Sequence, residues 1–182
     1  DAPLFNDYKK LEAGPLRDQI LSMARSHRIP ADDVWWFDAS KQTKRISANV
    51  SGFGGPMRIS LNDNLLRRSP EESVIAVLGH EMGHYVLDHV VEMLLELTLV
   101  IVAGFAFVHF SFERVARRYP GWRLDGIADS AGLPLASALL VVVMTLLTPV
   151  NNSIVRSNEA EADAFGIAAS GQPDGFAFAA VQ

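Results

Sequence analysis

The sequence has 182 residues with a net charge of −5, and apolar residues make up 49% of it. This length is enough for one domain with a real core, and the acidic balance argues against nucleic acid as a partner. The absence of cysteine excludes disulfides and thiolate metal sites, which leaves His, Asp and Glu as the strong metal ligands.

Residues 1–68 are predicted to form a small lobe that contains one helix and a three-stranded sheet. An amphipathic pattern over residues 15–28 predicts the helix, and β-rich runs at 34–37, 45–51 and 57–61 predict the strands. The middle run is polar, so we interpret it as an edge strand. It either belongs to a plain structural meander or receives an extended peptide by β-augmentation.

The segment 69–89 is predicted to be a well-started helix. Ser69 is a good N-cap residue, Pro70 suits the first helical position, and Glu72 stands where a capping box has its acidic residue. The apolar residues that follow recur with helical spacing. The helix prediction is therefore independent of the motif that the segment contains.

That motif is His80-Glu81-Met82-Gly83-His84, an H-E-x-x-H sequence. On a helix, His80 and His84 lie one turn apart on the same face, so two imidazole nitrogens can reach one zinc ion. Glu81 stands beside them and can act as a general base.

Two apolar segments, 90–112 and 131–150, follow the motif. Each has the ~20 residues that a bilayer requires, and the second carries no charge. Glu92 and Glu96 lie one turn apart in the first segment, on a face that would point to protein or to water. We interpret the segments as an antiparallel pair of transmembrane helices. The alternative is a soluble protein with two buried core helices.

A hairpin of two spans returns the chain to the side that His84 left, so a third metal ligand must come before residue 90 or after residue 150. Beyond the second span, polar residues recur at i, i+4, i+7 and i+11 of a predicted helix. They are Asn152, Arg156, Glu159 and Asp163. Glu159 can complete a His₂Glu zinc site, and Asp163 can hydrogen-bond one of the histidines. The plainer interpretation is an exposed charged helix.

Neighbouring residues are expected to have smaller roles. His89 stands five residues after the motif and is expected to face away from it, in a structural or supporting role. Glu161 falls on the other face of its predicted helix. The longer zinc motif with a third histidine is excluded, because it needs Gly and His where this chain has Leu87 and Val90.

In this combination of motifs, the sequence resembles the membrane-embedded zinc metalloproteases of the CAAX prenyl protease type, the Ste24 family, to which the HtpX heat-shock proteases are related. The likeness covers nearly all of the chain. Its parts are Asp1-Ala-Pro-Leu-Phe5, Arg58-Ile-Ser-Leu-Asn-Asp63 with Leu65-Leu66, the H-E-x-x-H helix with His89, the two apolar segments, and Arg156-x-x-Glu159-x-x-Ala162-Asp163-Ala164-Phe165. Two motifs joined across a two-span hairpin make the resemblance specific.

The resemblance implies His80, His84 and Glu159 as ligands of one Zn²⁺ per chain, and Glu81 as catalytic acid and base. The expected reaction is hydrolysis of peptide bonds in a peptide or protein, including the C-terminal peptide of a prenylated protein. One alternative is an HtpX-like quality-control protease that cleaves membrane proteins. Another is an inactive membrane scaffold with structural zinc, against which Glu81 argues, because a structural site has no use for a base.

The resemblance also implies supporting residues. Arg156 and Asp163 would act beside the zinc ligands, and Asn152 would contact substrate. Where the family has Asn-Ala-Tyr, this chain has Ser-Ala-Asn, so either Ser47 or Asn49 would contact the substrate backbone.

The sequence thus predicts a mainly α membrane protein with a single metalloprotease domain. The lobe at 1–68 and a zincin-type helix at 69–89 precede the spans 90–112 and 131–150, and the third-ligand helix lies within 151–182. The protein is expected in a bacterial inner membrane or the endoplasmic reticulum membrane. The arginine-rich connector would be cytoplasmic by the positive-inside rule, whereas the resemblance puts the catalytic side there, and we follow the resemblance. Further N-terminal spans of the family are absent, so we expect a piece of a longer protein.

Overall fold

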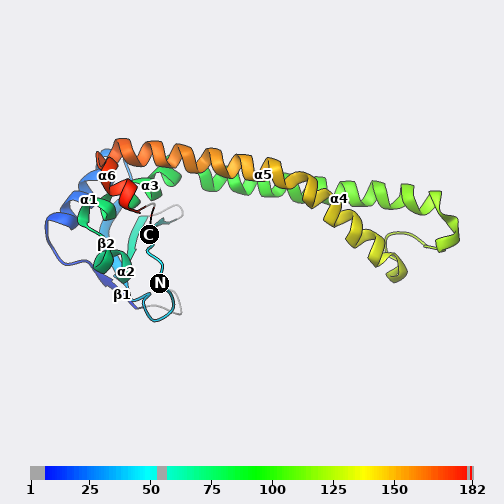
Figure 1. Ribbon diagram of the computed structural model, residues 1–182, viewed down its shortest axis with the longest axis horizontal. Coiled ribbons are helices and arrows are strands. Elements are labelled where there is room, and N and C mark those ends of the chain that lie inside the picture. The colour runs from blue at the N-terminus through cyan, green and yellow to red at the C-terminus, as the bar shows by residue number, and fades with distance from the viewer. Residues whose placement is uncertain (1–6, 53–56, 180, 182) are drawn as a thin grey trace. The chain divides into compact units, whose positions relative to one another are not determined.

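The structure is a computed structural model that describes residues 7–52, 57–179 and 181 (Figure 1). Two sequence features lie outside the described residues. They are the opening run at 1–5, which contributes to the family resemblance, and most of the glycine-containing segment 52–56, which separates the second and third predicted strands.

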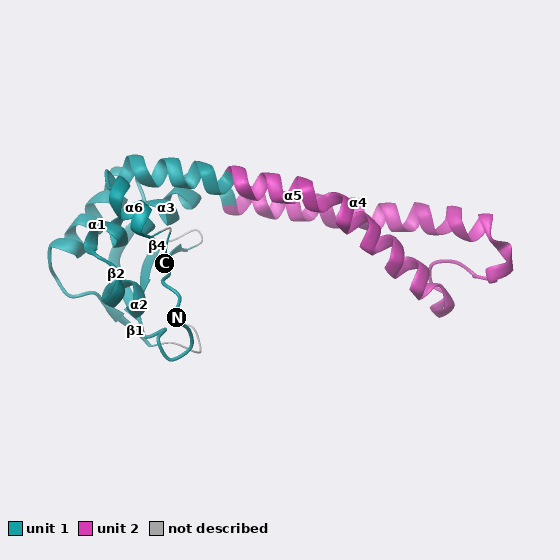
Figure 2. Ribbon diagram, in the orientation of Figure 1, with its two compact units in different colours: residues 1–89, 158–182 teal, residues 90–157 magenta. Residues whose placement is uncertain are grey.

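The chain divides into two compact units (Figure 2). Residues 1–89 and 158–182 form the first unit, and residues 90–157 form the second. Helix α5 (Leu133–Ser170) contributes to both. The chain therefore returns to the first unit along a single continuous helix, where the sequence predicted a span followed by a separate helix.

A four-stranded sheet forms one layer of the first unit. Its strands are β1 (Tyr8–Lys10), β2 (Ala31–Phe37), β3 (Ala48–Ser51) and β4 (Met57–Asn62), in the order β1-β2-β4-β3. β2 and β4 are parallel, and each outer strand pairs antiparallel to its neighbour. The predicted edge position of the middle strand is confirmed, because β3 pairs only with β4 among the described strands.

Two features of the predicted sheet are wrong. The sheet has a fourth strand, β1, which was missed because it has three residues, two of them lysines, and so carries no apolar alternation. The strands also do not form a meander. Because β2 and β4 run parallel, the chain must cross over between them, and that crossover carries β3.

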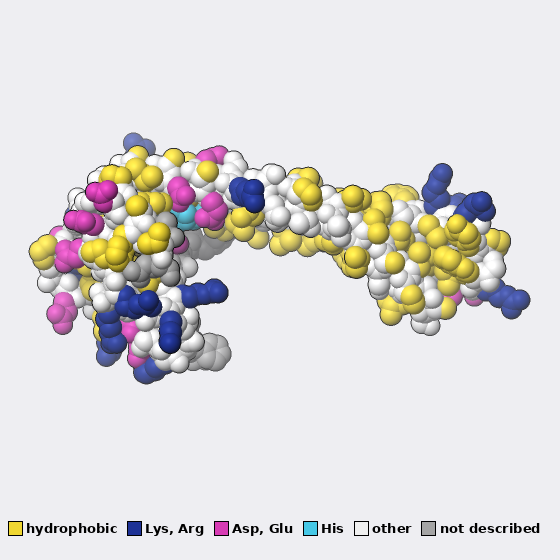
Figure 3. Space-filling view, in the orientation of Figure 1, with side chains coloured by type: hydrophobic (Ala, Val, Ile, Leu, Met, Phe, Trp, Pro, Cys, Tyr) yellow, Lys and Arg dark blue, Asp and Glu magenta, His cyan; other side chains and the backbone are white. Residues whose placement is uncertain are grey.

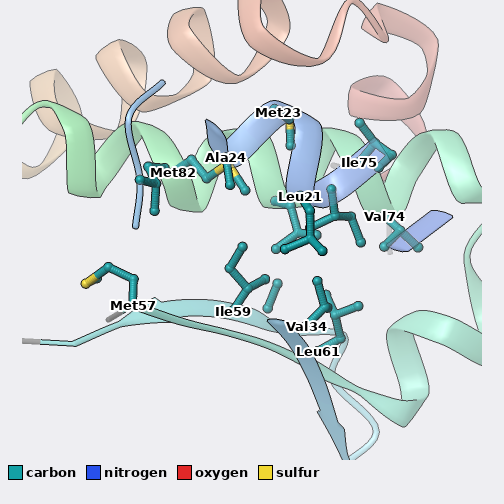
Figure 4. Packing of buried hydrophobic residues seen from close by; sticks show 14 of the residues in the cluster. Leu21, Met23, Ala24, Val34, Met57, Ile59, Leu61, Val74, Ile75 and Met82 are labelled. Atoms are coloured by element: carbon teal, nitrogen blue, oxygen red, sulfur yellow. The ribbon is translucent and has the colours of Figure 1, made fainter. Parts of the chain in front are cut away.

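The core of the first unit lies between the sheet and helices α1 (Pro15–Ser26) and α3 (Glu71–Val86) (Figure 4). Alternate side chains of β2 and β4 point towards the apolar stripes of the two helices. The almost fully buried members are Ile20, Ala24, Ile29, Val34, Ile59, Leu61, Leu65, Val74, Ile75, Leu78 and Met82. Each large aliphatic side chain contributes roughly 1.5–3 kcal/mol by leaving water, so the core fixes α3 firmly against the sheet.

Helix α3 begins and ends differently from the prediction. Its N-cap is Pro70, without a side-chain cap, whereas Ser69 ends the preceding short helix α2 (Asp63–Arg68). The predicted capping box from Ser69 to Glu72 is therefore wrong, because Ser69 already serves another helix. At its other end α3 stops at Val86, since Asp88 has a left-handed backbone with φ of 58°.

Small residues let α3 and α5 approach closely. Gly79 and Gly83 on α3 face Gly166 and Ala162 on α5. A Cβ added to Gly79 would lie 2.9 Å from the carbonyl oxygen of Gly166, and one added to Gly166 would lie 2.7 Å from the backbone nitrogen of His80. Backbones packed this closely bring the C-terminal part of α5 directly beside the H-E-x-x-H turn of α3.

The second unit consists mainly of α4 (His89–Arg118) and the first part of α5. Both helices are long and apolar enough to cross a membrane, with a mean hydropathy of 2.2 over 18-residue windows of which only 6% is buried. Figure 3 shows apolar side chains along them and basic side chains at the end where they are joined. The predicted span 90–112 lies within α4, and the predicted span 131–150 lies within α5 from Leu133 onward. The exposure of both helices does not fit core helices of a soluble domain.

Candidate metal centre

The two histidines of the motif lie on one face of α3, as the i, i+4 spacing requires. Their Nε2 atoms are 3.0 Å apart. Two ring nitrogens at this distance can share a proton or can both turn lone pairs to one cation. Nitrogens that share a zinc ion lie roughly 3–3.5 Å apart, given Zn–N bonds of about 2.0–2.1 Å. The pair is therefore spaced as metal ligands are.

Glu159 approaches the same point from α5. Its Oε2 lies 3.4 Å from Nε2 of His80, and its Oε1 lies 3.7 Å from Nε2 of His84. One ligand atom from each of the three residues lies within 4.8 Å of the others, which makes them a candidate metal site among the described residues. Two neutral imidazoles and a carboxylate with one side open fit a divalent metal that keeps a free coordination position.

Asp163 lies behind the first histidine. Its Oδ1 is 2.8 Å from Nδ1 of His80, the ring nitrogen that does not face Glu159. A carboxylate there accepts the Nδ1 proton of a neutral imidazole and leaves the Nε2 lone pair for a metal. The sequence predicted that Asp163 would hydrogen-bond one of the two histidines, and in the structure it lies beside His80.

The electrostatics of the site follow from partial burial. Burial raises the pKa of the Glu81 carboxyl, opposed by His80 and assisted by the charge of Glu159. Burial also lowers the pKa of His84, with a further decrease from the neighbouring His80. The raised pKa makes Glu81 a better proton acceptor, and the lowered pKa keeps the His84 imidazole neutral, as a metal ligand must be.

His89 was misjudged from the sequence. It was expected to face away from the motif, yet its Nδ1 lies 2.9 Å from Nδ1 of His84, and the side chain is only 1% exposed. The expectation assumed a continuous helix, whereas α3 ends before Asp88 and its left-handed backbone turns His89 back. Glu161, set aside as lying on another face, approaches Nε2 of His89 with Oε2 at 3.7 Å.

The remaining predicted residues lie further along the same elements. Arg156 and Asn152 are exposed on α5, before Glu159, and belong to the second unit. Asn49 is exposed on the edge strand β3, which packs against α3. Ser47 just precedes β3, where its carbonyl accepts a hydrogen bond from the Asn62 amide at 3.0 Å.

A cavity of about 250 Å³ lies beside His80. Val77 and His80 line it from α3, Asp163 lines it from α5, and Phe176 and Ala179 line it from α6 (Pro173–Ala179). Helix α6 packs against α3, and Gly175 lies so close to the carbonyl of Glu72 that a Cβ there would be 2.5 Å from it. The cavity is apolar apart from the His80–Asp163 pair.

Comparison with known proteins identifies the family. The sequence matches Peptidase family M48 over residues 10–182. The uncharacterized metalloprotease YhfN of Bacillus subtilis is 37% identical over 166 residues, which are 91% of this chain and 39% of that protein. A CAAX prenyl protease 1 homolog of Oryza sativa is 30% identical, over 90% of this chain and 39% of that protein.

The fold has a solved relative. The crystal structure of S. mikatae Ste24p matches with a TM-score of 0.68 and 26% identity, over 97% of this chain and 44% of that chain. The chain thus spans about two fifths of the length of the curated relatives it matches. The H-E-x-x-H helix, the convergent carboxylate and the family match lead to one conclusion: this chain belongs to Peptidase family M48.

Proposed function

We propose that this chain carries the catalytic site of a membrane-bound zinc metalloendopeptidase of the CAAX prenyl protease type. The observation that carries the proposal is the convergence of His80, His84 and Glu159 from two helices, with Glu81 in the same turn. One Zn²⁺ per chain would be held by these three residues. Zinc there supplies a Lewis acid that polarises a peptide carbonyl and makes water more acidic.

Glu81 is the proposed acid and base. It takes a proton from the attacking water and passes it to the leaving amine, which requires a carboxylate that is a better base than an exposed one. Partial burial supports this role, because it raises the pKa of the Glu81 carboxyl. A structural zinc site would have no use for such a group.

The supporting roles come from the residues around the ligands. Asp163 holds the Nδ1 proton of His80 and so orients that ring. Arg156, on the helix that carries Glu159, is proposed to orient Glu159 and Asp163 or to stabilise negative charge on the scissile carbonyl. Asn152 and either Ser47 or Asn49 are proposed to bind the substrate backbone.

Edge strand β3 is the proposed place where an extended peptide pairs with the protein. It packs against the H-E-x-x-H helix, and its outer side is unpaired among the described strands. A strand added there would run beside α3. The proposed substrate is the C-terminal peptide of a prenylated protein, supported by relatives that bear the name CAAX prenyl protease 1.

The proposed location is a membrane, with the catalytic side in the cytoplasm. The two long apolar helices support the first part, and the resemblance to the Ste24 family supports the second. Whether the membrane is a bacterial inner membrane or that of the endoplasmic reticulum depends on the source organism.

The test is zinc content and peptide cleavage in the full-length protein, with and without Glu81→Gln. We expect one zinc per chain in both proteins, and a loss of cleavage of at least about a thousandfold in the variant because the proton carrier is gone. Substrates are a farnesylated CAAX peptide and, for comparison, casein. Retained turnover in Glu81→Gln would contradict the mechanism, and cleavage of casein alone would contradict the proposed substrate.

A further inference from the structure

We propose that His89 is a positioning residue that fixes the tautomer and orientation of His84, with Glu161 behind it. The inference rests on the proposed function, because it concerns how the chain prepares one of the zinc ligands. It adds a support for the second histidine of the motif, as the Asp163–His80 pair does for the first.

The first step is the geometry of the His84 ring. Its Nε2 faces the other ligand atoms, 3.0 Å from Nε2 of His80 and 3.7 Å from Oε1 of Glu159. Its Nδ1 lies 2.9 Å from Nδ1 of His89. Both nitrogens of the ring are therefore engaged, one by the site and the other by a second imidazole.

The second step is where the protons lie. An Nε2 that binds a metal carries no proton, so the proton of neutral His84 is on Nδ1 and is donated to Nδ1 of His89. His89 then carries its own proton on Nε2. That atom is buried, and the nearby acceptor is Oε2 of Glu161, 3.7 Å away. The hydrogen bond thus runs from His84 to His89, and Nε2 of His89 faces a carboxylate that is too distant for a direct hydrogen bond.

The third step is burial, which gives this arrangement its rigidity. His89 is 1% exposed, so water cannot replace it as the partner of His84. Its backbone position is also fixed, because the left-handed Asp88 ends α3 and starts α4 at His89 itself. A residue five positions on in an unbroken helix would face away from His84.

Three acidic residues at alternate positions of α5 serve the histidines in different ways. Glu159 joins the ligands, Asp163 holds Nδ1 of His80, and Glu161 lies behind His89. One helix thus provides both the third ligand and the supports of the other two.

The test compares zinc affinities by competition with a chelator in the full-length protein. His89→Phe keeps the ring volume but removes the acceptor, and we expect its affinity to fall by about 10- to 100-fold. His89→Asn can place its Oδ1 where Nδ1 stood, and we expect it to restore most of the affinity. His109→Phe is the matched control, because His109 is half-exposed on α4 beside Glu113 and should leave the affinity unchanged.

A second readout separates positioning from packing. The absorption spectrum of the Co²⁺-loaded protein reports ligand geometry, so it should change in His89→Phe and return towards wild type in His89→Asn. Glu161→Ala should weaken zinc binding by less than His89→Phe, and the double variant should be no weaker than His89→Phe alone, since both residues act in one chain.

Several outcomes would overturn the inference. Equal affinity in wild type and His89→Phe would do so, as would equal losses in His89→Phe and His89→Asn, which indicate packing alone. If the Phe variant unfolds, the Asn variant decides, because loss of zinc from a folded Asn protein also removes the proposed role. A wild-type protein without zinc affinity would instead contradict the proposed function, so the two failures are distinguishable.

Discussion

At the scale of residues, the site is distinguished by its excess of negative charge. Glu81, Glu159, Glu161 and Asp163 all lie around the histidines, with no cysteine to contribute. The charge of Glu159 is one reason why the pKa of Glu81 is raised. A divalent cation would reverse that effect, because it is the largest local charge in such a site. The acidic residues thus favour the binding of a dication, which offsets the repulsion among their charges.

A different carboxylate should govern acid stability. Asp33 is held by Nζ of Lys10 at 2.8 Å, by the Arg17 guanidinium at 2.9 Å and by the Val34 amide at 2.9 Å. These hydrogen bonds, the one from Lys10 most of all, lower the pKa of Asp33 to about 2. They outweigh the opposing effect of burial. Asp33→Asn should therefore reduce the free energy of unfolding at pH 7, by about 1 kcal/mol.

The sign of this effect sets its pH dependence. The pKa of Asp33 in the folded protein is below the ordinary value of 3.8. Its contribution to the free energy of unfolding is therefore complete well above pH 4 and is lost as pH falls towards 2. In urea unfolding followed by tryptophan fluorescence, the difference between wild type and Asp33→Asn should be constant from pH 7 to about 5 and should fall by roughly half at pH 3. Asp18→Asn is the control, since Asp18 is exposed and 3.9 Å from Arg17. An undiminished difference at pH 3 would refute the assignment.

At the scale of elements, the site depends on how closely α3 and α5 pack. Gly166→Ala would place a Cβ 2.7 Å from the backbone nitrogen of His80 and 2.9 Å from the ring of Phe176. The helices must then separate by a few tenths of an ångström, which moves Glu159 away from the histidines. We expect stability to fall by about 1–3 kcal/mol and zinc affinity by at least tenfold.

Chelator competition and thermal unfolding measure these two effects of Gly166→Ala. Gly121→Ala is the matched control, because a Cβ at Gly121 meets nothing within 4 Å. Unchanged zinc affinity in Gly166→Ala would mean that the close contact does not position the third ligand.

The same elements mark what the sequence could and could not predict. The histidine pair and Glu159 could be predicted as site residues because their positions depend on helical periodicity, which is a local property of the sequence. The position of His89 could not be predicted, because it depends on the left-handed backbone of Asp88, and a periodic pattern of residues gives no sign of that conformation. The start of α3 was mistaken for a related reason. Ser69 suits two adjacent helix ends equally well, and tertiary packing decides between them.

The sheet and the helix crossing were harder to predict because they join distant parts of the chain. Parallel pairing of β2 with β4 and the added strand β1 are contacts of high sequence separation. The close approach of α3 and α5 joins small residues on either side of both candidate spans. Their small size was visible in the sequence, but the partner of each was not.

At the scale of the whole molecule, orientation in a membrane can be tested directly because the chain has no cysteine. We expect Gly121→Cys, in the connector, to react with a membrane-impermeant maleimide from the side opposite the metal centre. Asp18→Cys, in the first unit, should react only after the vesicles are opened. The measurement uses sealed vesicles whose cytoplasmic face is inside. The reverse pattern would put the metal centre outside, as the four connector arginines alone suggest.

The division of the ligands between α3 and α5 also has a consequence in time. Protein synthesis proceeds from the N-terminus, so His80 and His84 leave the ribosome before both candidate spans, and Glu159 leaves after them. At ordinary rates of translation the delay is on the order of ten seconds. During that interval the nascent chain holds an incomplete set of ligands. The order of the sequence therefore delays assembly of the candidate metal centre until the apolar hairpin has been made.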